Sequence, residues 1–307
     1  MRFLVPFLCL LALPATAQKI VRETDRFEFV YEVSVPAIQK SGRIWIPLAR
    51  SDRHQRVEHE TGASMKLKKL DDSRFGNRVL YAKLRPADSG KKIRIRYRVI
   101  RQENAGQKDT GDVQRFLKPS RLVPLTAELK RLAIQACAKG QGTEEQGKLL
   151  YWHTLKRMRY DKSGQGWGQG DAVYACDART GNCTDFHSYF IALARAMKIP
   201  ARFSIGFTIP ADRDEGSIAG YHCWAEFHVN DHWIPVDISE ADKHPELKDY
   251  YLGRHPANRF QLTQGRDLVV DPLPKSGPIN FLVYPVLEVD DQEQRAKCEF
   301  RFRRTGE

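Results

Sequence analysis

Alternation of apolar and polar positions dominates the first third of the chain. Phe27, Phe29 and Tyr31 alternate with charged or polar residues, and similar runs recur as far as residue 102. A period of two predicts β-strands with one buried face. Turn-forming stretches such as Asp88-Ser89-Gly90 separate these runs. We therefore expect a small β-sandwich module over residues 18–102, without a catalytic constellation of its own.

The hydrophobic period changes after a polar, glycine-containing stretch, residues 103–122, which is typical of a linker. Apolar residues then recur at spacings of three and four over 126–138 and 144–159, which predicts two helices. A third amphipathic helix is expected to begin at Cys183. Its apolar positions are Phe186, Tyr189, Phe190, Leu193, Ala194 and Met197.

A β-hairpin is predicted over residues 221–237, with Asn230-Asp231 as its two-residue turn. If residue 229 pairs with 232, His222 and Asp237 become diagonal neighbours on one face, about 7 Å apart at the backbone. A slip of one residue would place them on opposite faces. Glu226 shares this face, and we expect it to hold a neighbouring cation or backbone donor. The alternation of side chains between the two faces of the hairpin thus predicts a histidine–carboxylate pair.

Cys183 is the candidate nucleophile. Gly181 allows a sharp entry into the helix, and the unpaired N–H groups and dipole at a helix start favour a thiolate. The same N–H groups can stabilise an oxyanion. Cys183, His222 and Asp237 together form the parts of a nucleophile, base and orienting group. The alternative is a structural cysteine, which is also our interpretation of Cys176.

The amino-terminal pattern predicts export. A positive charge at Arg2 precedes the apolar stretch 3–13 and the small-residue pattern Ala15-Thr16-Ala17, which together indicate a signal peptide over residues 1–17. It is too short to span a bilayer, and no later segment has the roughly 18 apolar residues that a membrane helix needs. We expect a periplasmic or extracellular protein without stable membrane insertion.

Five cysteines remain once Cys9 leaves with the signal peptide. An oxidising compartment favours disulfides, but an odd number leaves at least one thiol unpaired unless it bonds another chain. If Cys183 is that thiol, the other four allow three pairings that the sequence does not rank. They are Cys137, Cys176, Cys223 and Cys298.

The formal net charge of +12 is spread along the chain. Arg94, Arg96 and Arg98 alternate with apolar residues and are expected on the solvated face of a strand. Residues 296–307 are interpreted as a basic tail. A basic surface favours anionic partners, here envelope polymers or acidic proteins, and no nucleic-acid motif is present.

These motifs together resemble the transglutaminase-like superfamily, the circularly rearranged relatives of papain-type cysteine proteases. The resemblance runs from about Gly147 to Asp290, and the upstream β-module resembles the extension of exported bacterial members. It rests on Met158-Arg159-Tyr160-Asp161, Gly181-Asn182-Cys183-Thr184-Asp185-Phe186, residues 194–202, His222-Cys223-Trp224-Ala225-Glu226 and Val236-Asp237.

The resemblance implies an α+β fold over residues 123–295, with the cysteine helix packed against an antiparallel sheet. It assigns Cys183 as nucleophile, His222 as general base and acid, and Asp237 as the group that orients the imidazole. Trp167 and Trp224 become candidates for oxyanion support or substrate contact. No cofactor, metal or calcium dependence is implied.

The predicted function is an exported cysteine-dependent acyl transferase or hydrolase. It would act on carboxamide or peptide bonds of an envelope protein or peptide through a thioester, with crosslinking and hydrolysis both open. One alternative is a non-catalytic peptide- or glycan-binding protein. Another is a zinc site, which lacks the usual Cys-x-x-Cys pair. Its ligands would come from Cys176, Cys183, His187, His222 and Cys223.

Overall fold

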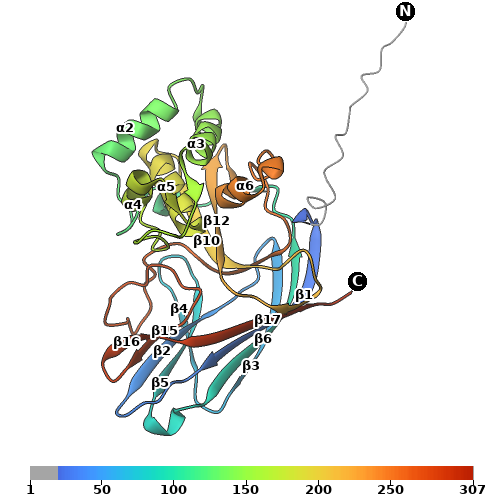
Figure 1. Ribbon diagram of the computed structural model, residues 1–307, viewed down its shortest axis with the longest axis vertical. Helices are drawn as coiled ribbons and strands as arrows, with labels where there is room; N and C mark the ends of the chain where they lie inside the picture. Colours follow the sequence, from blue (N-terminus) through green and yellow to red (C-terminus); the bar gives the residue numbers. More distant parts are fainter. Residues whose placement is uncertain (1–19, 307) are drawn as a thin grey trace, which may run out of the picture.

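The computed structural model describes residues 20–306. The predicted signal peptide, residues 1–17, and its Cys9 lie outside the described residues. The fold is mixed α/β with mostly antiparallel sheets, and its main helices gather at one end of a β-sandwich (Figure 1). Within residues 20–306, no helix has the length and apolar character needed to cross a bilayer.

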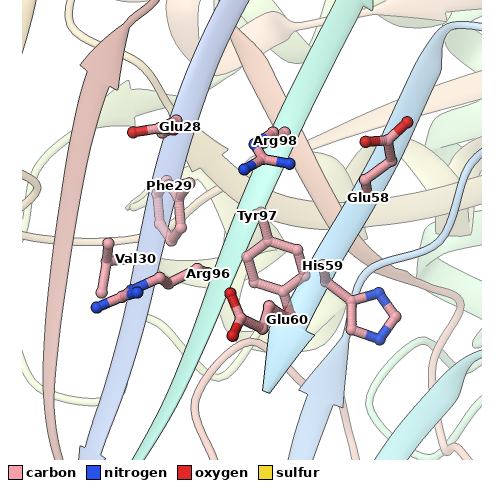
Figure 2. A pocket seen from close by; sticks show the side chains of 9 residues that line it. All are labelled: Glu28, Phe29, Val30, Glu58, His59, Glu60, Arg96, Tyr97 and Arg98. Carbon is pink, nitrogen blue, oxygen red and sulfur yellow. The ribbon is translucent and has the colours of Figure 1, made fainter. Parts of the chain in front are cut away.

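The first sandwich sheet is built around β1. Phe27, Phe29 and Tyr31 are buried there, as their alternation predicts. On the outer face, Glu28, Arg98 and Glu58 form a row across three strands (Figure 2). The arginines therefore lie on the solvated face of the sheet, as expected, and alternate there with carboxylates. The sheet order is β11 (Glu215–Ser217), β17 (Lys297–Arg304), β1 (Thr24–Ser34), β6 (Lys92–Gln102) and β3 (Gln55–Ala63).

The second sandwich sheet has β2 at its centre, which is buried on both faces. Ile44 and Ile46 join the core shared with the first sheet. Trp45 faces the other way, where Leu268 and Leu282 cover it and its indole N–H donates to Pro272 O (2.8 Å). The sheet order is β16 (Gln292–Arg295), β15 (Val286–Val289), β2 (Gly42–Leu48), β5 (Arg78–Leu84) and β4 (Lys68–Asp71).

The carboxyl-terminal segment completes this sandwich, which corrects two predictions. Strand β17 pairs with β1 over Lys297–Arg304, so the predicted basic tail at 296–307 is wrong. Phe300 and Phe302 are buried between charged residues, a strand pattern that the arginine run obscures. The catalytic part predicted over 123–295 also ends earlier, because β15 and β16 belong to the sandwich.

Residues 103–122 are packed rather than a free linker. Strand β7 (Gln107–Lys108) pairs with β13 (His232–Val236), and η2 (Gln114–Phe116) follows β7 in the chain. The Phe116 ring is buried against Trp233, with centroids 5.1 Å apart, and the buried Arg195 donates to Phe116 O (2.8 Å). The segment is polar because only a few of its side chains point inward.

The third sheet carries the predicted hairpin. Val229 pairs with His232 and Ala225 with Val236, which is the register expected from the two-residue turn. Asn230 and Asp231 have φ values of 49° and 61°, as the tight turn requires. The sheet order is β14 (Arg259–Gln264), β10 (Ala201–Thr208), β12 (His222–Val229), β13 (His232–Val236) and β7.

The three predicted helices are present. They are α2 (Ala127–Ala136), α3 (Thr143–Arg157) and α5 (Cys183–Ala196). Two short helices were not predicted, α4 (Ala172–Ala178), which contains Cys176, and α6 (Ile238–Lys243). The remaining short elements are η1 (Pro86–Asp88), η3 (Pro245–Leu247), β8 (Arg159–Tyr160) and β9 (Thr180–Gly181).

The sandwich and the third sheet share one hydrophobic core. The Phe29 ring of β1 lies 5.1 Å from Phe207 of β10 and 4.9 Å from Phe260 of β14, measured between centroids. Because these rings are fully buried, the two parts are held in one orientation. This fixes the sandwich beside the face that carries the candidate site.

Candidate active site

The start of α5 positions Cys183. Asn182 caps the helix by accepting from Thr184 N–H (2.9 Å), while Asp185 accepts from Asn182 N–H (2.9 Å). This reciprocal arrangement is a capping box, and its Asn-x-x-Asp spacing is a local signal that the predicted helix start did not draw on. Cys183 N–H lies at the first helical position and has no acceptor within residues 20–306. It is therefore available to a developing oxyanion.

Asp185 also fixes the loop opposite the helix start. It accepts hydrogen bonds from Gly168 N–H (2.7 Å) and Gly170 N–H (3.0 Å). Burial raises the pKa of Asp185 to about 6 even though these N–H groups oppose the rise. Gly181 has φ 151°, and a Cβ there would collide with the Asp185 side chain. The glycine before the cysteine is thus needed for close packing as well as for its backbone angle.

The predicted histidine–carboxylate pair forms. His222 Nε2 lies 2.7 Å from Asp237 Oδ2, and the two side chains are 5% and 0% exposed. Asp237 also accepts from Arg259 Nη2 (3.0 Å) and caps α6 through Glu240 N–H (3.2 Å). Because the carboxylate must accept, His222 Nε2 donates, which leaves Nδ1 to face the thiol.

Electrostatics favour a thiolate–imidazolium pair. Burial opposes ionisation of the Cys183 thiol, but hydrogen bonds from Cys223 and His222 and the histidine charge hold its pKa well below the usual value. Burial likewise opposes the charge on His222, yet Asp237 and Cys183 raise its pKa to about 9. Asp237 stays ionised, because His222 and Arg259 outweigh burial and lower its pKa. These are the opposed shifts that a nucleophile and its proton carrier need.

Two further side chains support the cysteine. His187 Nε2 accepts from Ile238 N–H (3.1 Å), so its proton is on Nδ1, which donates to Cys183 O (2.8 Å). This neutral imidazole joins the first turn of α5 to the residue after Asp237. Cys223 Sγ lies 3.6 Å from His187 Nδ1 and contacts the Cys183 thiol.

Structure separates the two tryptophan candidates. Trp167 is half-buried and lines a groove that also contains Tyr221, whose hydroxyl accepts from Asn182 Nδ2 (2.9 Å). Trp224 is only 1% exposed and packs beside His222, with ring centroids 5.9 Å apart. It shields the His222–Asp237 pair, so the expectation that it contacts a substrate is corrected.

The remaining predictions concern ion pairs, disulfides and zinc. Glu226 holds a cation, as expected, through two hydrogen bonds from Arg202 (2.6 and 2.9 Å). Both ring nitrogens of His187 are engaged, which removes it from the proposed zinc ligands. The expected disulfides are absent: the five cysteines within residues 20–306 are free thiols. They are Cys137, Cys176, Cys183, Cys223 and Cys298.

Comparison with known proteins identifies the family. Residues 130–238, which contain Cys183 and His222 and reach past Asp237, match the model of the transglutaminase-like superfamily. This domain belongs to that superfamily. The transglutaminase-like fold carries an additional β-sandwich here, and family and fold together support a cysteine-dependent enzyme.

The similarity to known proteins extends beyond this domain to most of the chain. A Haemophilus influenzae protein without a described function is 26% identical over 86% of this chain and 85% of its own. The crystal structure of a proposed cysteine protease from Cytophaga hutchinsonii has a TM-score of 0.62 at 16% identity, covering 90% of each chain. It shows the same fold. The periplasmic domain of TgpA from Pseudomonas aeruginosa is a weaker likeness, with 14% identity, a TM-score of 0.39 and coverage of 78% of this chain and 95% of that domain.

Proposed function

We propose that this protein is an exported acyl transferase or hydrolase that acts on carboxamide or peptide bonds through a thioester on Cys183. The convergence of Cys183, His222 and Asp237 in one buried site supports this proposal most directly. The opposed pKa shifts of the thiol and the imidazole add to it, because they favour the reactive ion pair at neutral pH.

The proposed reaction has two halves. The Cys183 thiolate attacks the carbonyl carbon, and Cys183 N–H donates to the oxyanion that forms. The His222 imidazolium then gives its proton to the departing amine, which leaves the thioester. In the second half, neutral His222 takes a proton from an incoming amine or water, and the thiolate departs. An amine gives a new amide bond, whereas water gives hydrolysis.

Asp237 has a positioning and electrostatic role in this scheme. Its carboxylate fixes the imidazole through Nε2 and stabilises the charge that His222 carries in the resting enzyme. Arg259 holds the carboxylate from the other side. Export is part of the proposal and rests on the amino-terminal sequence pattern, so we propose envelope proteins or peptides as substrates.

The test compares thiol reactivity with acyl transfer. Protein treated with iodoacetamide at pH 7 should be alkylated at Cys183, as read by peptide mass spectrometry, and this labelling should fall sharply in His222→Ala. Dimethylcasein with a biotinylated pentylamine then reports transfer, and release of casein peptides reports hydrolysis. Alkylation of Cys183 no faster than in urea-denatured protein would instead favour a non-catalytic binding protein.

A further inference from the structure

A groove of about 920 Å³ lies between the transglutaminase-like domain and the sandwich. One wall is formed by Trp167 to Gln169, the loop that Asp185 holds. The opposite wall is formed by Arg295, Ala296 and residues 298–301, at the end of β16 and the start of β17, with residues 217–219 beside them. Tyr221, Phe281 and Tyr284 lie between the walls. Because the two parts share one core, this groove is a fixed feature of the molecule.

Aromatic rings connect the groove to the candidate site. The Tyr221 ring lies 5.7 Å from Tyr284, which lies 5.8 Å from Phe300 of β17, measured between centroids. Tyr221 directly precedes His222 and bonds to Asn182 beside Cys183. Tyr284 is 38% exposed, one of few large apolar side chains that open to solvent. A ligand in this groove would therefore pass from β17 to the thiol over an aromatic floor.

The β17 wall has an open backbone edge. Strand β1 pairs with β17 over Lys297–Arg304, but on the other side β11 covers only residues 301–303. One further bond, Ile218 N–H to Phe300 O (2.9 Å), ends this pairing. Main-chain groups alternate along β17: those of Phe300 and Arg304 face the β11 side, whereas Lys297 and Glu299 face β1. The N–H and C=O of Cys298 therefore remain open to the groove, at an edge that can accept an added strand.

Two arginines give this end of the groove its charge. Arg295 and Arg301 are exposed, and neither forms a salt bridge with any carboxylate in residues 20–306. Farther along β17, Arg303 and Arg304 do have carboxylate partners. Glu299 is the one acidic side chain among those lining the groove. The unpaired cations favour an acidic ligand in a chain of net charge +12.

We propose that this groove binds an extended, acidic polypeptide segment as an added strand on β17 and leads it toward Cys183. The inference rests on the proposed function, since the segment would belong to the protein substrate. Main-chain bonds to Cys298 supply sequence-independent affinity. Arg295 and Arg301 select acidic side chains, and the aromatic floor takes an apolar residue nearer the thiol.

The test measures binding to the full chain carrying Cys183→Ala, so that no turnover occurs. The probes are two fluorescein-labelled peptides, GEETFTVEEG and GKKTFTVKKG, and an acidic peptide with prolines, GEEPFPVEEG, followed by fluorescence anisotropy. The acidic peptide should bind at least about tenfold more tightly than the basic one. The prolines should weaken binding, because they remove the N–H groups that a paired strand donates.

The double variant Arg295→Glu/Arg301→Glu should lose about tenfold in affinity for the acidic peptide and gain affinity for the basic one. Its matched control is Lys66→Glu/Lys69→Glu. Lys69 lies in β4, at the opposite edge of the same sheet from β16, and Lys66 lies just before it. Both are exposed, and the net charge changes equally. Equal loss in both double variants would mean general charge attraction and would overturn the proposal, as would unchanged binding in the groove variant.

Two readouts separate this inference from the proposed function. Iodoacetamide alkylation of Cys183 in the groove variant, with the cysteine restored, should match the wild type. Normal alkylation with no preference for the acidic peptide overturns the groove proposal alone, whereas slow alkylation with selective binding overturns the catalytic proposal alone. Self-association that disappears in the groove variant, seen by sedimentation, would assign the groove to a second copy of the chain and overturn the peptide proposal.

Discussion

The substitution Asp237→Asn should uncouple the thiol from its imidazole. Asp237 is the main cause that raises the pKa of His222 to about 9, and burial opposes it. Relative to the usual value of 6.5, that rise corresponds to about 3 kcal/mol at about 1.4 kcal/mol per pKa unit. Without the carboxylate, burial dominates and the pKa should fall below 6.5. At pH 7.5 the imidazole would then be mostly neutral, and the Cys183 thiolate would lose its counter-charge.

The assay is the rate of Cys183 alkylation by iodoacetamide between pH 5 and 9. At pH 7 we expect a fall of at least about tenfold, and loss of the whole rise from 6.5 to about 9 would correspond to about 300-fold. Unfolding should also become easier, on the order of 3 kcal/mol, because the buried Arg259 loses its carboxylate partner. Circular dichroism must therefore confirm that the variant is folded at the assay temperature.

Glu226→Gln is the matched control for this substitution. Glu226 lies on the same strand as His222, is buried, and pairs with Arg202 as Asp237 pairs with Arg259. It should cost similar stability but leave alkylation of Cys183 unchanged. A folded Asp237→Asn protein that is alkylated at the wild-type rate across this pH range would refute the assigned role of Asp237.

Four further predictions follow from the same geometry. Turnover should decline above about pH 9, where His222 loses the proton that its raised pKa retains at lower pH, whereas alkylation should not decline. Hydrogen peroxide should oxidise Cys183 and Cys223 to a disulfide, with peroxide reduced to water. Mass spectrometry should find that the protein has lost two hydrogen atoms, and Cys223→Ala should prevent this loss. Asp185→Asn leaves one carbonyl oxygen for three N–H donors, so hydrogen exchange at residues 168–170 should quicken about tenfold and alkylation should slow. Deleting residues 296–307 removes β17 and should abolish the cooperative thermal transition that calorimetry detects in the full chain.

Local patterns predicted much of the site. The α5 helix and the 221–237 hairpin rest on short-range periodicity, and in the hairpin a two-residue turn fixes the register. The His222–Asp237 contact follows from that register. The resemblance to the superfamily, rather than periodicity, supplied the packing of α5 on the third sheet. The residues that a single hairpin or helix controls were therefore predictable.

Long-range partners were not predictable in this way. Strand β17 pairs with β1 across most of the chain, and Arg259 reaches Asp237 from a different strand. Alternation along β12 places Cys223 on the face opposite His222, but it could not show that α5 packs on that face. Cys183 lies near the first residues of β12, where side chains from both faces reach its thiol. Such contacts depend on how elements meet in three dimensions.

The interleaved order of the sandwich strands has a consequence for biosynthesis. Strand β17, which joins β1 to β11 in the first sheet, follows the other strands of residues 20–306 in the chain, so the sheet that supports the groove stays incomplete until synthesis has passed residue 304. A prematurely terminated chain would leave β1 with an open, apolar edge and would be a target for proteolysis. We therefore expect activity only from chains that have been synthesised to the end of β17.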